Sequence, residues 1–344
     1  MTHVGARSGV RRRAVPDRRP RPAGPVPPDQ PAGPARRTGP RPHPVTFSHS
    51  TDPPRSTLQQ AGVVAASVQA VIRLGGPVVI RTPVVFIHGA WLHARSWESW
   101  TARFAGHGYA ACAPGWPGEA PTAREARERP EAVPDLGLDD LTEHFAEVVR
   151  SFEVPPVIVG HSVGGLVAQH LIGARLGQAA VAIAPAPIND IALHTGPGSA
   201  DETSRAPVLL SPRRFREVFA NAAGPGEAER LYDRYAVPVP RRLLDDLGCA
   251  GRPRTPGALV DTGNTGRGPL LLVSGQEDLL VPDVVTRTVY KEYGDSTALT
   301  DLKQFADRGH SLVVDSGWRF VADHVLGWLD RRGVRPTGPG PGRH

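Results

Sequence analysis

Short apolar runs alternate with amphipathic segments from residue 83 onward, and this alternation constrains the fold more than any other feature of the chain. Residues 84–87, 157–159 and 270–273 are continuous runs of large apolar residues. Such runs are typical of strands that are buried on both faces of a parallel sheet. The segments between them, such as 138–152, place their apolar residues on one helical stripe. The pattern predicts an α/β fold, with a mostly parallel sheet flanked by helices.

The alternation also predicts the limits of the domain, which we place at residues 83–332. Within it, residues 185–265 contain no clear strand but two helical stretches, 212–220 and 226–235. An insertion of this size between two core strands is most simply a helical cap over the carboxyl ends of the strands, where parallel sheets bind their ligands.

The basic residues are concentrated in the first 55 residues, which contain 11 Arg against 3 Asp, together with 13 of the 37 prolines. The rest of the chain has 29 basic and 31 acidic residues, so the folded part needs no basic surface for its chemistry. We expect residues 1–55 and 333–344 to be disordered tails, because they contain little apolar surface to bury. Residues 56–82 receive no assignment. A nucleic-acid tail and an export signal at Arg11–Arg13 remain less favoured interpretations, the latter because no apolar segment follows closely.

Several classes of protein are disfavoured by the composition. Two cysteines cannot form a disulfide framework, and no His or Cys spacing indicates a metal site. No glycine-rich nucleotide motif occurs, and no run of 18 apolar residues indicates a membrane span. We therefore expect no cofactor, metal, nucleic-acid partner or membrane partner, and a cytoplasmic protein whose partner is a small molecule. The oligomeric state is left open.

The motif Gly-His-Ser-Val-Gly at residues 160–164 lies between a predicted strand and a predicted helix. In that context a G-x-S-x-G motif is typical of a sharp turn that exposes a serine hydroxyl. Gly160 and Gly164 leave room for the neighbouring chain, and the helix N-terminus favours a developing negative charge. We interpret Ser162 as a nucleophile, although a glycine-rich turn with a helix-capping serine has the same local sequence.

A serine nucleophile needs a base and an acid that orients the base. Asp278 follows the predicted strand 270–273, and His310 follows the predicted strand 301–305. Both therefore belong to loops at the carboxyl edge of the sheet, and the order Ser162, Asp278, His310 is the usual one for such a fold. Glu277 is the competing acid.

Two backbone N–H groups must also meet the oxyanion of an acyl-transfer transition state. We assign them to Val163, which follows the nucleophile, and to Ala90 in the loop after the first strong strand. Trp91, next in the chain, is predicted to form a wall of the substrate pocket. His88 is interpreted as a residue that braces this loop by hydrogen bonds.

Four motifs in this order resemble the α/β-hydrolase superfamily: FIHG (86–89), GHSVGG (160–165), SGQED (274–278) and DRGHS (307–311). The segment from His88 through 116–118 is similar to a group of actinobacterial hydrolases. The resemblance implies a Ser-His-Asp serine hydrolase of the α/β-hydrolase fold, with a cap after the sixth of the usual eight strands. Clear equivalents of the first two strands are missing, unless residues 61–80 supply them.

These observations predict an enzyme that cleaves a small or medium carboxylic ester, thioester or lactone through an acyl-enzyme. One alternative is a ligand receptor of the same fold with slow or no turnover. Another is haloperoxidase-like or lyase chemistry in the same site, although residues 185–265 contain no lysine for a hydroxynitrile lyase.

Overall fold

The computed structural model describes residues 81–191, 205–248 and 255–336, all within the compact unit of residues 52–344. The predicted tail of residues 1–55 and residues 56–80 of the unassigned segment lie outside the described residues. No helix in the described part of the chain is long and apolar enough to cross a membrane.

The described strands form one parallel sheet with the order β2-β1-β3-β4-β5-β6, as the apolar runs predicted. The strands are β1 (Pro83–Ile87), β2 (Ala110–Cys112), β3 (Val157–His161), β4 (Ala179–Ile183), β5 (Leu270–Gly275) and β6 (Thr300–Phe305). β2 thus lies beside β1 at one edge of the sheet. The chain then returns to the other side of β1 with β3, and β4, β5 and β6 follow in order to the opposite edge. Every residue of β1, β3, β4 and β5 is buried, whereas the edge strand β6 is half-buried throughout.

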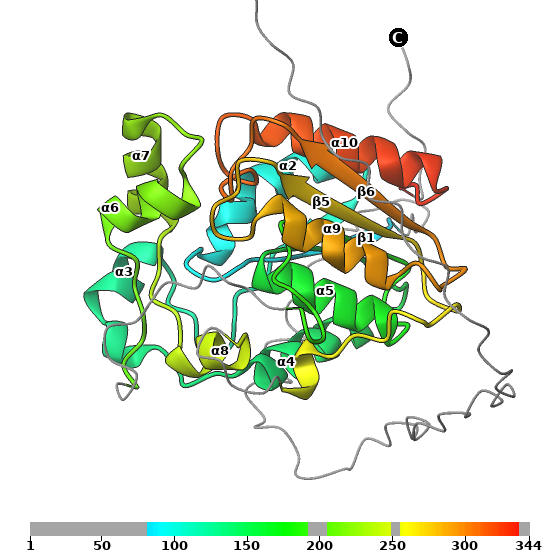
Figure 1. Cartoon of the computed structure of the whole chain (residues 1–344), viewed down its shortest axis with the longest axis horizontal. Coiled ribbons are helices and arrows are strands. Elements are labelled where there is room, and N and C mark those ends of the chain that lie inside the picture. The colour runs from blue at the N-terminus through cyan, green and yellow to red at the C-terminus, as the bar shows by residue number, and fades with distance from the viewer. Residues whose placement is uncertain (1–80, 192–204, 249–254, 337–344) are drawn as a thin grey trace, which may run out of the picture. The chain divides into compact units, whose positions relative to one another are not determined.

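Helices cover both faces of the sheet (Figure 1). One face carries α4 (Leu138–Arg150), α5 (Val163–Gly173) and α9 (Asp283–Glu292), and the other carries α2 (Glu98–Gly106) and α10 (Trp318–Arg331). The hydroxyl of Tyr293, at the end of α9, donates to Gln169 Oε1 of α5 at 3.0 Å. Because the helices cover the two faces of the sheet, the loops that follow the strands lie together at the end of the sheet that contains the strand C-termini.

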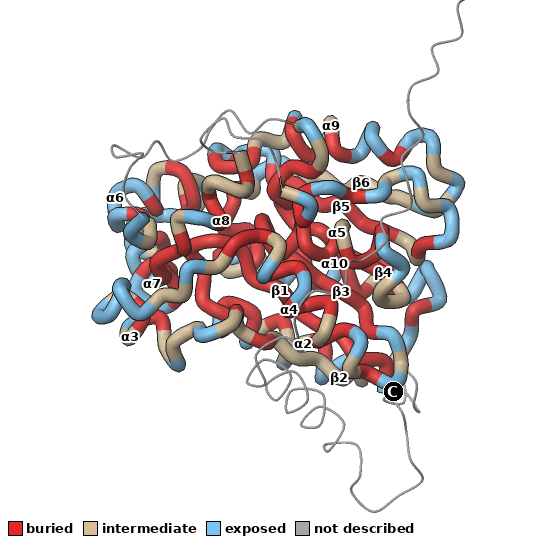
Figure 2. Tube along the Cα trace, turned by 90° about the horizontal axis from the view of Figure 1, so that it is seen from below, coloured by how far each residue is buried: buried red, intermediate tan, exposed pale blue. Residues whose placement is uncertain are grey.

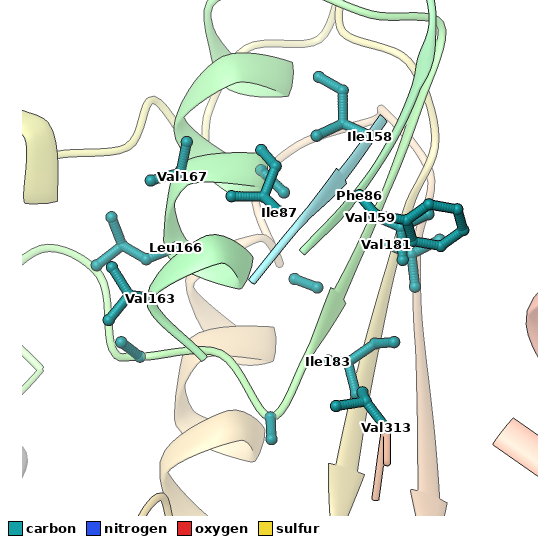
Figure 3. Close-up of a cluster of buried hydrophobic side chains, with 14 of the residues drawn as sticks. Phe86, Ile87, Ile158, Val159, Val163, Leu166, Val167, Val181, Ile183 and Val313 are labelled. Carbon is teal, nitrogen blue, oxygen red and sulfur yellow. The ribbon is translucent and has the colours of Figure 1, made fainter. Parts of the chain in front are cut away.

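The buried residues lie along the sheet between these layers (Figure 2). On one side the ring of Phe86 packs against Trp97 and Phe104, with ring centroids 5.0 and 5.2 Å apart. On the other side Val163 and Val167 lie on the face of α5 that points away from the strands, and they belong to the same buried apolar cluster (Figure 3). Because this core fixes β3 and α5 together, the turn between them has a defined position.

The chain between β4 and β5 contains helices but no strand among its described residues. Its helices are α6 (Pro212–Arg214), the π-helical turn η3 (Phe215–Phe219), α7 (Pro225–Tyr235), α8 (Arg241–Asp246) and the 3₁₀ turn η4 (Pro256–Ala258). The predicted helix 212–220 is thus one α turn followed by a π turn, in which the rings of Phe215 and Phe219 stack at 4.6 Å. An antiparallel bridge between Leu92 and Ala236 joins this inserted segment to the loop after β1.

Further short helices occur in the connections before β3. They are the 3₁₀ turn η1 (Ala94–Trp97), α3 (Ala123–Glu128) and the 3₁₀ turn η2 (Pro130–Ala132). The 3₁₀ turn η1 leads directly into α2. Thr122 begins α3, because its hydroxyl accepts a hydrogen bond from the N–H of Glu125 at 3.2 Å.

The ordered chain continues past the predicted boundary at residue 332. Val334 is buried, and its carbonyl accepts a hydrogen bond from the Tyr109 hydroxyl at 2.8 Å. Thr82 Oγ1 likewise donates to the carbonyl of Arg335 at 2.6 Å. These long-range contacts hold residues 334 and 335 against the domain, although their composition predicted disorder. Residues 337–344 lie outside the described part of the chain.

Candidate active site

Ser162 lies in the turn between β3 and α5 and has φ 54° and ψ −116°, a conformation that non-glycine residues rarely adopt. A Cβ atom at Gly160 would come within 1.9 Å of the Gly164 carbonyl oxygen, and one at Gly164 within 2.2 Å of the Ile87 carbonyl oxygen. The two glycines of the motif therefore permit the close chain approach that the turn requires. The Ser162 N–H donates to the Ile183 carbonyl at 2.9 Å, which ties the turn to β4.

Asp278 and His310 form a buried hydrogen-bonded pair on the loops after β5 and β6. The Nδ1–H of His310 donates to Asp278 Oδ2 at 2.7 Å, and both side chains are almost fully buried. The other oxygen, Oδ1, accepts the N–H groups of Leu280 and Val281 at 2.9 and 2.8 Å. Glu277, the competing acid, is exposed. Because Nδ1 donates to the carboxylate, Nε2 of the neutral ring has the lone pair, and it has no hydrogen-bond partner among the described residues.

The residue that precedes the serine places this pair beside the turn. His161 is fully buried, and its Nε2–H donates to the carbonyl of His310 at 2.9 Å. The two imidazole rings lie 4.6 Å apart. Burial and the neighbouring His310 lower the pKa of His161 well below its ordinary value, so this ring is a neutral spacer. The structure thus brings the loop of Asp278 and the loop of His310 to the end of the sheet where the turn of Ser162 lies.

The loop after β1 approaches the serine so closely that residue 89 has no space for a side chain. A Cβ atom at Gly89 would lie 2.6 Å from Ser162 Cβ and 2.9 Å from the His161 carbonyl oxygen. The next residue, Ala90, is buried, and neither its N–H nor that of Val163 donates to an acceptor in the described part of the chain. An oxyanion site requires two N–H donors without other acceptors, and the assignment of Ala90 and Val163 to such a site stays a prediction.

Trp91, predicted to line the pocket, is buried with φ 61°. Its Nε1–H donates to the Val208 carbonyl at 3.1 Å, and its own carbonyl accepts the Val237 N–H at 3.3 Å. The side chain therefore joins the loop after β1 to the inserted segment. Its role as a wall of a substrate pocket stays a prediction.

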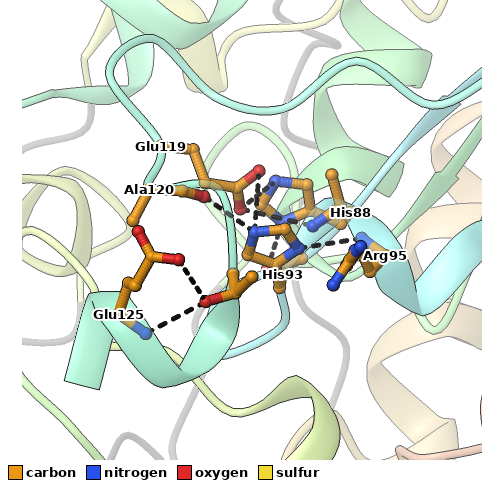
Figure 4. A network of polar contacts seen from close by, with 9 residues as sticks. His88, His93, Arg95, Glu119, Ala120 and Glu125 are labelled. Atoms are coloured by element: carbon orange, nitrogen blue, oxygen red, sulfur yellow. Dashed lines mark hydrogen bonds and ion pairs between the residues drawn. The ribbon is translucent and has the colours of Figure 1, made fainter. Parts of the chain in front are cut away.

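A second pair of a carboxyl group and an imidazole joins the buried His88 of the same loop to the partly buried Glu119 (Figure 4). His88 donates through Nδ1 to the Gly89 carbonyl at 3.1 Å, as expected for a bracing residue, and its Nε2 faces Glu119 Oε1 at 3.2 Å. Glu119 Oε1 also accepts the Ala94 N–H at 3.2 Å. Burial lowers the pKa of His88 to about 3 and raises that of Glu119 to about 8, so both groups are mainly neutral at pH 7.

Sequence reasoning did not single out Glu119. In the sequence Glu119 is marked only by its position in the loop after β2, three residues after Trp116. This position does not indicate that His88 and Ala94 contact its carboxyl group in the folded chain. Nor did sequence reasoning find Asn221, which follows the π-helical turn. Its Nδ2 donates to the Glu277 carbonyl at 2.7 Å, next to Asp278. In the same turn Phe219 presents its ring to the imidazole of His310, with centroids 4.9 Å apart and planes at 82°.

No group of three or more His, Cys, Asp or Glu side chains that could hold a metal ion occurs within residues 81–191, 205–248 and 255–336. Cys112 is a free thiol, and burial raises its pKa to about 12, which does not suit a nucleophile. Cys249 lies outside the described residues.

Comparison with known proteins agrees with the fold. A family model described as "Alpha/beta hydrolase family" matches residues 84–324. A methylesterase from Arabidopsis shares the fold with a TM-score of 0.52 and 17% identity, over 73% of this chain and 99% of that one. A monoacylglycerol lipase from Paleococcus ferrophilus gives a TM-score of 0.53 and 18% identity over 73% and 94%, and tomato methylketone synthase I gives 0.53 and 13% over 74% and 99%. No curated protein sequence matches the chain.

Proposed function

Because the chain belongs to the alpha/beta hydrolase family, we propose that it is a serine hydrolase that cleaves a small or medium carboxylic ester. The observation that supports this most is the hydrogen bond from His310 Nδ1 to Asp278 Oδ2, since it leaves a basic Nε2 beside the turn of Ser162. Thioesters and lactones react through the same acyl-enzyme and belong to the proposal. The names of two structural neighbours, a methylesterase and a monoacylglycerol lipase, are consistent with ester cleavage.

In the first half of the proposed reaction, Ser162 Oγ attacks the ester carbonyl carbon as His310 Nε2 takes the hydroxyl proton. The imidazolium is stabilised by Asp278, whose carboxylate also accepts two backbone N–H groups. The oxyanion accepts hydrogen bonds from the N–H groups of Ala90 and Val163.

The tetrahedral intermediate then expels the alcohol, which takes the proton from His310 Nε2 and leaves an ester on Ser162. In the second half, His310 removes a proton from water, which attacks this ester. The carboxylic acid departs, and the proton returns to Ser162 Oγ, so that the enzyme is regenerated. No step needs a cofactor or a metal ion.

The experiment combines labelling with turnover. The purified chain is treated with a fluorophosphonate, analysed by mass spectrometry, and assayed on p-nitrophenyl acetate, butyrate and octanoate, with Ser162→Ala as the control. We expect one label on Ser162, several turnovers per enzyme, and neither labelling nor turnover in the variant. A folded wild-type protein that neither reacts with the label nor hydrolyses any ester refutes the proposal. Stoichiometric acylation without further turnover would support a receptor instead.

A further inference from the structure

His310 lies in the segment of residues 306–317 between β6 and α10, which is neither strand nor regular helix. A general base must stay within hydrogen-bond reach of the proton that it removes. A displacement of about 1 Å in such a group can lower the rate roughly 100-fold. Contacts that fix the backbone on both sides of His310 therefore bear directly on the proposed reaction.

Asp315 fixes this segment on the carboxyl side of His310. Its side chain is almost fully buried, Oδ2 accepts the hydroxyl hydrogen of Ser311 at 3.1 Å, and Oδ1 accepts the N–H of Gly317 at 2.9 Å. The N–H of Asp315 donates in turn to the Ser311 carbonyl at 2.9 Å. Ser311, the residue directly after the histidine, is thus bound to Asp315 through both its side chain and its backbone.

Arg308 connects the amino side of His310 to the same carboxyl group. Its guanidinium lies 3.6 Å from Asp315 Oδ1, and its side chain is 19% exposed. Its carbonyl accepts the N–H of Glu277 at 3.0 Å, which ties the segment to the loop of Asp278. The residues two positions before and one position after His310 therefore converge on one carboxyl group.

A carboxyl group is an unfavourable choice for a buried anchor unless its hydrogen bonds matter. Burial raises the pKa of Asp315, and the nearby Glu227 acts in the same direction, whereas Gly317, Arg308 and Ser311 lower it. An apolar side chain would fill the same space without this desolvation cost, but it could not bind a hydroxyl, a backbone N–H and a guanidinium together. The carboxyl group is therefore explained by the directional contacts that it makes within the segment.

We propose that Asp315 is a positioning residue for the base: its carboxyl group holds Ser311 and Arg308, and through them it keeps the imidazole of His310 bound to Asp278. The inference rests on the proposed function in one respect, that His310 acts as the base. Asp315 acts through the backbone of its segment, so its effect is on the orientation of the imidazole rather than on the binding of a substrate.

The first test compares two substitutions by steady-state kinetics on p-nitrophenyl butyrate. Asp315→Ala removes every side-chain contact and is expected to lower kcat about 100-fold with KM within about twofold, as for a displaced reacting group. Asp315→Asn still accepts the Gly317 N–H and donates to the Ser311 hydroxyl, so kcat should stay within about threefold of wild type. Wild-type kcat in Asp315→Ala, or equal losses in the two variants, would overturn the proposal.

The second test observes the imidazole itself and needs no turnover. Long-range proton–nitrogen NMR of the chain with isotope-labelled histidine distinguishes Nδ1–H from Nε2–H in a neutral ring, and His310→Ala assigns the signals. His310 bound to Asp278 has its proton on Nδ1. We expect this tautomer in wild type and in Asp315→Asn, and a mixture of tautomers in Asp315→Ala. An unmixed Nδ1–H ring in Asp315→Ala would contradict the proposal.

Val289→Ala controls for a general loss of stability, because it removes buried apolar volume on α9. It is expected to lower the midpoint of urea unfolding while it retains kcat and the Nδ1–H tautomer. If it changes both as Asp315→Ala does, the proposal fails.

Ser311→Ala provides a second route if Asp315→Ala does not fold, because it removes only the hydroxyl. Its kcat is expected to fall about fivefold, as for one hydrogen bond. Wild-type kcat together with an unmixed Nδ1–H tautomer in this variant would refute the proposal.

The two tests separate this proposal from the proposed function. A folded chain that neither reacts with the fluorophosphonate nor hydrolyses an ester refutes the proposed function, and the tautomer of His310 in Asp315→Ala and Asp315→Asn then still decides whether Asp315 orients the imidazole. An active wild type with unchanged kinetics and tautomer in Asp315→Ala refutes the positioning role alone.

Discussion

Two pairs of a carboxyl group and an imidazole in the described part of the chain differ in how many hydrogen bonds the carboxyl group accepts. Asp278 accepts three, from His310 Nδ1 and from two backbone N–H groups. Glu119 accepts one backbone N–H, and its contact with His88 Nε2 is longer, 3.2 Å against 2.7 Å. Hydrogen-bond donors stabilise a buried negative charge, so Asp278 is better supported as an acceptor than Glu119, whose pair with His88 is mainly neutral at pH 7.

The two imidazoles also differ in orientation. His310 directs Nδ1 to its carboxylate, whereas His88 directs Nδ1 to the carbonyl of its own loop and has Glu119 Oε1 3.2 Å from its Nε2. The first arrangement suits proton transfer with a group from outside the pair. The second suits a structural role behind the loop.

Exchanging each carboxyl group for its amide gives the largest expected contrast. Asp278→Asn reverses the tautomer preference of His310 and is expected to lower kcat for a p-nitrophenyl ester about 10⁴-fold. Glu119→Gln keeps a neutral side chain of the same shape and is expected to lower kcat less than about tenfold. Steady-state kinetics measures both. Similar losses in the two variants would show that the pairs are not functionally different.

The loop between His88 and the serine allows a second test. Gly89→Ala introduces a methyl group 2.6 Å from Ser162 Cβ, so the loop must move away, and we expect kcat to fall at least about 100-fold through a displaced oxyanion donor. Gly106→Ala is the matched control, because a Cβ atom there meets nothing within 4 Å. An active Gly89→Ala enzyme with unchanged kinetics would contradict this account of the loop.

Protonation of Glu119 can be tested through stability. The pKa of its carboxyl group is raised to about 8 in the folded chain from an ordinary 4.5, so between these values the folded state retains a proton that the unfolded state has released. Stability therefore falls as pH rises through this range, by about 1.4 kcal/mol per pH unit from this group at most. Glu119→Gln lacks this dependence, so urea unfolding from pH 5 to pH 9 should show its advantage over wild type increase with pH. A constant difference would mean that Glu119 is ionised throughout.

A moderate effect on kcat is expected at Asn221. Asn221→Ala removes the hydrogen bond to the Glu277 carbonyl that steadies the loop of Asp278, and about a tenfold loss of kcat with little change of KM is expected. A shift in the pH profile of kcat would show that the loss acts through the Asp278–His310 pair. Arg213→Ala, an exposed change in the same inserted segment, is the control and should leave both parameters unchanged.

Continuous apolar strands made most of the sheet predictable. In β1, β3 and β5 every side chain is buried, so the sequence pattern reflects one environment on both faces. Helix α3 was missed although Thr122 and Glu125 form a capping signal, because its six residues are too few to show an apolar stripe. The π-helical turn has no recognised signal in the sequence, since it depends on how its aromatic side chains pack.

In the candidate site, too, residues with a local sequence signal were predictable and residues that depend on long-range packing were not. Ser162, Asp278 and His310 follow strands or precede a helix, so local sequence and strand order indicated them. Glu119 and Asn221 do not lie next to a strand end, and their contacts depend on segments that meet only in the folded chain.

The aromatic contacts around His310 restrict the motion of its ring. Phe219 approaches the ring at 4.9 Å, His161 lies 4.6 Å away, and Asp278 is bound to Nδ1. A half-turn of the imidazole would break the bond to Asp278 and displace both aromatic neighbours. Nε2 must consequently both accept the proton and release it again. The leaving group and the incoming water therefore reach the histidine from the same side, one after the other.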